Sequence, residues 1–166
     1  MLNLHAKQDY SEETIALVKS YEKRIKALSM VNKYLKFDED DTNGIVNLKL
    51  YCKDLIESFE IAYSVEDDVI VKKKLEALEV KQNIGMKLGI VLSELLTNSY
   101  KHGKKKDKAL LINVDCISKG NHIRLIVKDN GLQELPNNNE KGMGTALSNQ
   151  FLKELGGNIE IKHHEG

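Results

Sequence analysis

Between Asn83 and Tyr100, apolar residues recur every three or four positions, which is the spacing of one face of an α-helix. The apolar side consists of Ile84, Leu88, Val91, Leu92 and Leu95. Such a stripe has to be buried against another apolar surface, so the segment predicts a helix packed on a core. Four polar residues flank the stripe: Glu94, Asn98, Lys101 and His102. Because helix residues three or four apart are neighbours, these side chains are expected to gather at one edge of the helix.

Three further segments have the helical spacing of apolar residues. They lie at about 11–35, 48–63 and 145–155, and Gly156-Gly157 ends the last of them. The first carries a seam of apolar or aromatic positions: Ile15, Val18, Tyr21, Ile25, Leu28, Val31 and Leu35. The charged segment 36–44 that follows ends in Asn-Gly, which is typical of a linker. The sequence therefore predicts a helical region over 1–36 and a separate domain over 45–166.

Alternating or β-branched runs predict the strands. They lie within 69–80, 110–117, 123–127 and 158–162. Lys119-Gly120-Asn121 joins the middle two as a hairpin. Glycines, asparagines and a proline between 130 and 144 indicate a long loop. Helices and hairpins are mixed without strict β–α–β alternation. We therefore predict an α+β fold: a two-layer sandwich with a mixed sheet under helices, preceded by a long N-terminal helix.

Composition excludes several classes of protein. The 25 basic and 25 acidic residues cancel, whereas a nucleic-acid-binding module normally carries a basic excess. No apolar run approaches the roughly 20 residues that span a bilayer, and the charged start does not resemble a signal peptide. Cys52 and Cys116 fit no metal-site spacing and are expected to be reduced thiols. We therefore expect a cytoplasmic segment that contacts neither nucleic acid nor membrane.

Two more patches could carry chemistry beside the polar edge of the 83–100 helix. In the segment 127–131, Val-Lys-Asp-Asn-Gly, a strand runs into a turn, so the Asp129 carboxylate can reach a cavity and accept a hydrogen bond. The segment 142–145, Gly-Met-Gly-Thr, opens a helix, where glycines let the backbone approach a ligand and free N–H groups suit phosphate. Taken singly, each patch is more typical of an ordinary turn, helix start or solvated helix face than of a ligand site.

In combination, the patches resemble the Bergerat (GHKL) ATP-binding fold, which histidine kinases share with type II topoisomerases, mismatch-repair ATPases and anti-sigma-factor kinases. The segment 94–102, Glu-Leu-Leu-Thr-Asn-Ser-Tyr-Lys-His, is similar to the N box of sensor histidine kinases. Residues 127–131 resemble their first glycine box, and residues 142–147 with 155–157 resemble the second. The start of the chain, through about residue 31, looks like part of the helical dimerisation region of these kinases.

This resemblance implies a role for each matching residue. Asn98 would ligate Mg²⁺, and Glu94 would orient or deprotonate the incoming nucleophile. Lys101 and His102 would neutralise phosphate charge, and Asp129 would accept a hydrogen bond from the N6 amino group of adenine. The remaining cofactor-binding positions belong to the two glycine boxes: Gly131, Gly142, Met143, Gly144, Thr145 and Leu147.

The resemblance also implies an activity and partners. The chain is expected to be the ATP-binding catalytic domain of a sensor histidine kinase, which transfers the ATP γ-phosphoryl group to histidine for relay to a response regulator receiver domain. Residues 1–36 would contribute to a homodimer. In these kinases the phosphoacceptor precedes the residue that matches Met1, and a strand follows the one that matches 158–162. We therefore expect a fragment of a longer protein that does not phosphorylate itself.

Two alternatives stay open at this point. A serine kinase of the anti-sigma-factor type has the same ATP site, although the N-terminal helix disfavours it. A degenerate scaffold that binds ATP without phosphotransfer is the other alternative, because Leu132-Gln133-Glu134 stands where the family has a second glycine.

Overall fold

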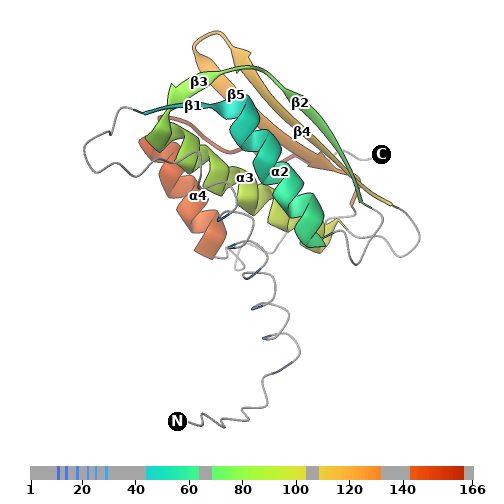
Figure 1. Cartoon of the computed structure of the whole chain (residues 1–166). Helices are drawn as coiled ribbons and strands as arrows, with labels where there is room; N and C mark the ends of the chain where they lie inside the picture. Colours follow the sequence, from blue (N-terminus) through green and yellow to red (C-terminus); the bar gives the residue numbers. More distant parts are fainter. Residues whose placement is uncertain are drawn as a thin grey trace, which may run out of the picture.

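The computed structural model describes residues 44–63, 69–103, 109–131 and 143–162, together with single positions between 11 and 29. Three helices lie along one face of a three-stranded sheet, and a short two-stranded ribbon lies beside them (Figure 1). Helical positions between 14 and 29 precede these elements in the chain. The predicted α+β sandwich, with a mixed sheet under helices and a helix before it, is confirmed.

The main sheet has the order β2-β4-β5, formed by Val69–Leu75, Leu110–Lys119 and His122–Asp129. Strands β2 and β4 are parallel, whereas β4 and β5 form the predicted antiparallel hairpin. Side chains of β4 alternate between buried and exposed, because successive residues of a strand point to opposite faces of the sheet. The register pairs Ile112 with Asp129, so the end of β5 lies beside the beginning of β4.

The helical layer consists of α2 (Leu48–Tyr63), α3 (Gln82–His102) and α4 (Met143–Glu154). β1 (Ile45–Asn47) and β3 (Glu79–Lys81) pair as an antiparallel ribbon. In the chain, β1 directly precedes α2 and β3 directly precedes α3. The apolar faces of α2 and α3 meet the buried face of β4 in one core. Its fully buried side chains include Tyr51, Leu55, Phe59, Leu92, Leu96, Ile112 and Val114.

Helix α4 ends in a Schellman motif formed by the glycine pair that follows it. Gly156 adopts a φ of 68°, a left-handed conformation that glycine takes without a steric penalty. The Gly157 N–H donates to the Leu152 carbonyl at 2.7 Å, and the Gly156 N–H donates to the Lys153 carbonyl at 3.0 Å. The predicted helix end is confirmed, although α4 begins at Met143, two residues before the expected start.

The strand predicted at 158–162 is wrong. These residues form no ladder with any strand in the described ranges, and the Ile161 side chain is 63% exposed. Alternation of apolar and polar residues indicates only which way side chains would point in an extended segment. A strand also needs a neighbour that satisfies its backbone N–H and C=O groups, and alternation does not supply one.

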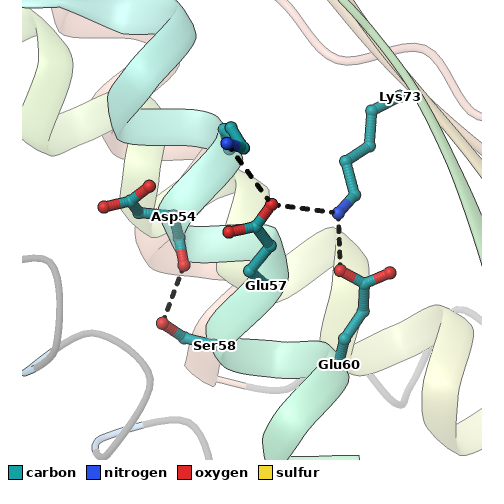
Figure 2. Close-up of polar contacts among 6 residues, drawn as sticks. Asp54, Glu57, Ser58, Glu60 and Lys73 are labelled. Atoms are coloured by element: carbon teal, nitrogen blue, oxygen red, sulfur yellow. Dashed lines mark hydrogen bonds and ion pairs between the residues drawn. The ribbon is translucent and has the colours of Figure 1, made fainter.

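A lysine ties the edge strand β2 to α2 (Figure 2). The Nζ atom of Lys73 lies 2.6 Å from Oε2 of Glu60 and 3.6 Å from Oε1 of Glu57. Three lysines follow one another in β2, and strand alternation turns the middle one toward α2 while Lys72 and Lys74 are exposed. Ion pairs that remain partly accessible to water contribute about 1 kcal/mol or less each, so the pairs orient the helix on the sheet more than they stabilise it.

The two cysteines, which are far apart in the sequence, meet in the core. Cys52 on α2 and Cys116 on β4 are each 1% exposed, and both are free thiols. A side-chain hydrogen bond with Cys116, together with burial, raises the pKa of Cys52, so this thiol stays protonated. Their free state agrees with the expectation of reduced thiols.

Three aromatic rings stack at the C-terminal ends of α2 and α3. The ring centroids of Tyr63 and Tyr100 are 4.3 Å apart with an interplanar angle of 17°, and Phe59 stacks on Tyr63 at 5.9 Å. This stack joins the last turns of the two helices. It therefore anchors the part of α3 that carries the predicted site residues.

We expect Tyr100→Phe to leave the free energy of unfolding unchanged or to raise it by up to about 1 kcal/mol. The Tyr100 hydroxyl is buried and lacks a hydrogen-bond partner within the described part of the chain. Burial, with Glu60 and Tyr63 nearby, raises the pKa of Tyr100 and keeps the hydroxyl neutral. Removing an unsatisfied buried hydroxyl should therefore cost nothing.

Urea unfolding followed by circular dichroism measures this effect. The comparison variant Tyr100→Ala, which removes the ring itself, should lower the free energy of unfolding by about 3 kcal/mol. A comparable loss in Tyr100→Phe would contradict the assignment of the hydroxyl as unsatisfied.

Candidate functional site

The C-terminal half of α3 carries the polar side chains predicted to bind a ligand. Glu94 and Asn98 are half-buried and lie one helical turn apart, and Lys101 is exposed. Leu92 and Leu96 are fully buried on the core side of the same helix. Because that side of α3 is packed in the core, Glu94 and Asn98 lie at the edge of the core, as the helical spacing predicts. His102 is the last residue of α3.

Asp129, at the end of β5, has its carboxylate held by two donors. The Ser99 hydroxyl on α3 donates to Oδ2 at 2.7 Å, and the Gly131 backbone N–H donates to Oδ1 at 3.0 Å. Ser99 is buried and Asp129 is half-buried. These two bonds fix the orientation of the carboxylate at the point where β5 meets α3.

A glycine–glycine contact brings the turn after β5 close to the end of α3. A Cβ atom added to Gly131 would collide with the Cα atom of Gly103, the residue that follows α3. The Gly103 N–H in turn donates to the Ser99 carbonyl at 2.8 Å. Gly131 is therefore needed where two backbones approach each other, a role that the sequence pattern did not indicate.

Asn130 fixes the same turn to the sheet. Its Oδ1 accepts a hydrogen bond from the Leu111 N–H at 2.8 Å, and its Nδ2 donates to the Ala109 carbonyl at 3.1 Å. Its own N–H donates to the Leu111 carbonyl at 3.2 Å. The side chain thus extends the hairpin ladder by one step beyond Asp129 and holds that residue in place.

Helix α4 lies beside α3 and runs antiparallel to it (Figure 1). The Lys87 Nζ atom lies 2.7 Å from Oε2 of Glu154, the last residue of α4. Glu154 is 11 residues after Met143, and Asn98 is 11 residues after Lys87, which is about 16 Å along each helix at 1.5 Å per residue. The first turn of α4 therefore lies at about the same height along α3 as Asn98.

The predicted second glycine box is only partly within the described residues. Gly144 and Thr145 lie in the first turn of α4, which begins at Met143, and Leu147 one turn later is 38% exposed. The prediction for Gly142 falls outside the described residues. Across the described ranges, no three His, Cys, Asp or Glu side chains gather in a way that could hold a metal ion.

Residues 83–166 match the family model described as histidine kinase-, DNA gyrase B-, and HSP90-like ATPase. The chain belongs to this ATPase family. The matched region covers half of the chain and contains α3, the β4–β5 hairpin and α4. Membership of this ATPase family implies ATP binding, and it confirms the resemblance that the three sequence patches indicated.

Two solved structures share the fold of this ATPase family member. The histidine kinase domain from the Erythrobacter litoralis EL346 blue-light activated histidine kinase superposes with a TM-score of 0.70 at 19% identity, over 82% of this chain and 65% of that chain. A second structure, of the Erythrobacter litoralis EL346 blue-light activated histidine kinase, gives a TM-score of 0.62 at 20% identity, over 86% and 51%. At these identities the likeness concerns the fold.

A comparison with curated proteins finds no match to this chain. Among the helical residues that the structure describes, no helix combines the length and the apolar character required to cross a bilayer.

The structure joins two of the three patches, because Ser99 and Gly103 connect α3 to the turn at Asp129. Sequence reasoning missed both of these residues, and it missed Asn130 as well. Ser99 lies inside the N-box segment, yet a serine on a helix gives no sign of the residue that its hydroxyl will reach. The roles assigned to Glu94 and Asn98 stay predictions.

Proposed function

We propose that the chain is the catalytic ATP-binding domain of a sensor histidine kinase that works in the cytoplasm. It transfers the γ-phosphoryl group of ATP to a histidine, from which the group passes to a response regulator receiver domain. The observation that carries this proposal is the hydrogen bond from Ser99 to Asp129, which joins the predicted adenine acceptor to the helix of the predicted metal ligand. Two histidine kinase structures with the same fold support it.

The donors and acceptors around Asp129 fit an adenine base. An ionised carboxylate offers about four lone-pair sites, and the two donors seen here use two of them. The half-buried carboxylate can therefore still accept a hydrogen bond from the N6 amino group of adenine. Guanine presents a carbonyl oxygen at that position, so an acceptor would face an acceptor.

Asn98 and Glu94 provide the groups that phosphotransfer requires. Mg²⁺ takes few protein ligands and completes its octahedral shell with phosphate oxygens and waters, so one amide oxygen from Asn98 suffices. Glu94, one turn away and half-buried, accepts a proton from or orients the attacking nucleophile. ATP supplies the electrophilic phosphorus, and Lys101, with His102, neutralises charge on its phosphates. The chain contributes mainly positioning and electrostatic stabilisation.

Asn98→Ala is expected to abolish the dependence of ATP affinity on Mg²⁺ while leaving the fold intact, because the protein's ligand to the metal is lost. Isothermal titration calorimetry with ATP, in the presence of Mg²⁺ and in EDTA, measures this dependence, and circular dichroism checks the fold. The matched control is Asn113→Ala, which removes an exposed amide on β4. A Mg²⁺-dependent affinity gain of wild-type size in Asn98→Ala would exclude the metal-ligand role.

Incubation with γ-labelled ATP and Mg²⁺ tests the proposed reaction. The chain is combined with a histidine-bearing dimerisation fragment of a related kinase, and the chemical stability of the transferred label is measured. Acid-labile, base-stable label supports histidine phosphorylation. Acid-stable label indicates a serine kinase, and ATP binding with no transferred label indicates a nucleotide-dependent scaffold.

Self-association through the N-terminal helix belongs to the same proposal. The described seam residues Val18 and Ile25, seven positions apart, are 51% and 62% exposed. The Ser11 hydroxyl accepts a hydrogen bond from the Thr14 N–H at 3.2 Å, as an N-cap residue does at a helix start. Exposed apolar side chains at heptad spacing favour pairing with another helix.

We expect weak dimerisation that Val18→Lys together with Ile25→Lys abolishes, because two charges would be buried at the helix pairing. Sedimentation velocity across a concentration series measures the association. The control variant is Ile45→Lys together with Ile161→Lys, which places the same two charges at similarly exposed isoleucines outside this helix. A wild-type chain that stays monomeric at the highest concentration would contradict the proposed pairing.

A further inference from the structure

Ser99 differs from the other serine and threonine residues of its helix and of α2. Ser58, Ser93 and Thr97 each donate to a backbone carbonyl three or four residues earlier in the same helix. The Ser99 hydroxyl instead leaves its helix and donates to Oδ2 of Asp129, thirty residues further along the chain, at 2.7 Å. Ser99 is only 3% exposed, so water does not replace this donor readily.

The contact is part of a closed ring of four residues. Ser99 donates to Asp129, and Asp129 accepts a second bond from the Gly131 N–H. Gly131 packs against Gly103, and the Gly103 N–H donates to the Ser99 carbonyl. The two glycines let the end of α3 approach the turn after β5, which brings the hydroxyl within hydrogen-bond distance of the carboxylate.

We propose that Ser99 is a positioning residue that sets the purine selectivity of the site through Asp129. This inference rests on the proposed function, since it takes Asp129 as the adenine acceptor. The terminal torsion of an aspartate is soft and permits a broad range of carboxylate orientations. Donors on both oxygens restrict that range and leave the remaining lone pairs aimed in a set direction. A carboxylate whose orientation is already fixed loses less conformational entropy when adenine binds.

The selectivity can be measured with two nucleotides that differ only at the 6-position of the purine. ATP carries the amino group that Asp129 would accept, and purine riboside 5′-triphosphate lacks it. Isothermal titration of both in Mg²⁺ gives an affinity ratio for the wild type, Ser99→Ala, Ser99→Thr and the control Ser58→Ala. Ser58 is a similarly buried serine on α2, whose hydroxyl bonds within its own helix (Figure 2).

We expect the wild type and Ser58→Ala to prefer ATP by about tenfold or more, the size of one hydrogen bond to a charged group. Ser99→Ala should reduce the preference to within about threefold, through weaker ATP binding alone. The affinity of purine riboside triphosphate should stay within a factor of two. Ser99→Thr keeps a hydroxyl and should retain most of the preference.

The outcomes separate this inference from the proposed function. A wild type that binds both nucleotides equally would refute the adenine role of Asp129, and the inference with it. A wild-type preference that survives in Ser99→Ala would overturn the inference alone. An equal loss of both affinities in Ser99→Ala would overturn it too, because the serine would then act on general structure and not through the purine amino group.

Discussion

Asp129→Asn is expected to weaken ATP binding by about 100-fold or more. The Gly131 N–H can only donate, so the new amide turns its oxygen toward Gly131. Its NH₂ group then takes the place of Oδ2, where it can donate to the Ser99 oxygen but offers no lone pair to the amino group of adenine. The variant therefore replaces one of the two acceptor oxygens with a donor and loses the negative charge that strengthens a hydrogen bond to adenine.

Isothermal titration of ATP and GTP against both proteins checks this prediction. The wild type should bind ATP more than tenfold tighter than GTP, and the variant should lose that preference. Asp115→Asn is the control, because it removes a negative charge from β4 on the opposite face of the same sheet. Equal binding of ATP and GTP by the wild type would exclude the adenine role of Asp129.

Glu94→Gln should lower the rate of phosphotransfer by about 10²–10⁴-fold, the usual contribution of a general base. The amide has nearly the shape of the carboxylate but cannot take up a proton. Glu94 is assigned to contact neither the adenine ring nor the metal ion. The affinity for Mg-ATP should therefore stay within about twofold of the wild type, a far smaller change than the loss of a charge-assisted hydrogen bond would cause.

Transfer of label from ATP to a histidine-bearing fragment gives the rate, and titration of the same samples gives the affinity. Glu79→Gln, at an exposed position on β3, controls for the loss of one charge. If the phosphotransfer rate and the Mg-ATP affinity fell in parallel, Glu94 would be a binding residue, and another residue would have to be the general base.

Several elements could be predicted because their causes are local. The apolar stripe of α3 depends on spacing within one helix, and the β4–β5 hairpin depends on alternation around Gly120-Asn121. The end of α4 depends on Gly156-Gly157 next to it. Each of these patterns lies within a window of about 20 residues or fewer, so neighbouring side chains and backbone preferences suffice to specify it.

The family could also be predicted from the sequence, because its motifs keep their order along the chain. Glu94 and Asn98 on a helix, Asp129 at the end of a strand and Gly144 at a helix start were enough to indicate an ATP-binding fold, and the match over 83–166 confirms the family. The chemical roles of these residues depend on the ligand that they meet, and they remain to be tested.

The failed strand at 158–162 shows what local patterns leave out. Its alternation is genuine, but a strand is stable only when another backbone pairs with it, and the sequence of the segment does not contain that partner. The same reason explains why two other contacts could not be predicted from the sequence: the hydrogen bond between Cys52 and Cys116, and the ion pair of Lys73 with Glu60 on α2.

The sequence alone therefore determined which helices and turns form and which polar residues each one carries, since periodicity and glycine caps act between near neighbours. Only the tertiary structure decided that Ser99 holds Asp129 and that Gly131 meets Gly103. These contacts join segments about thirty residues apart, and they exist because burial of the α3 stripe against β4 brings the end of the helix to the end of β5. Hydrogen bonds and close backbone approaches follow from that packing, which no local pattern specifies.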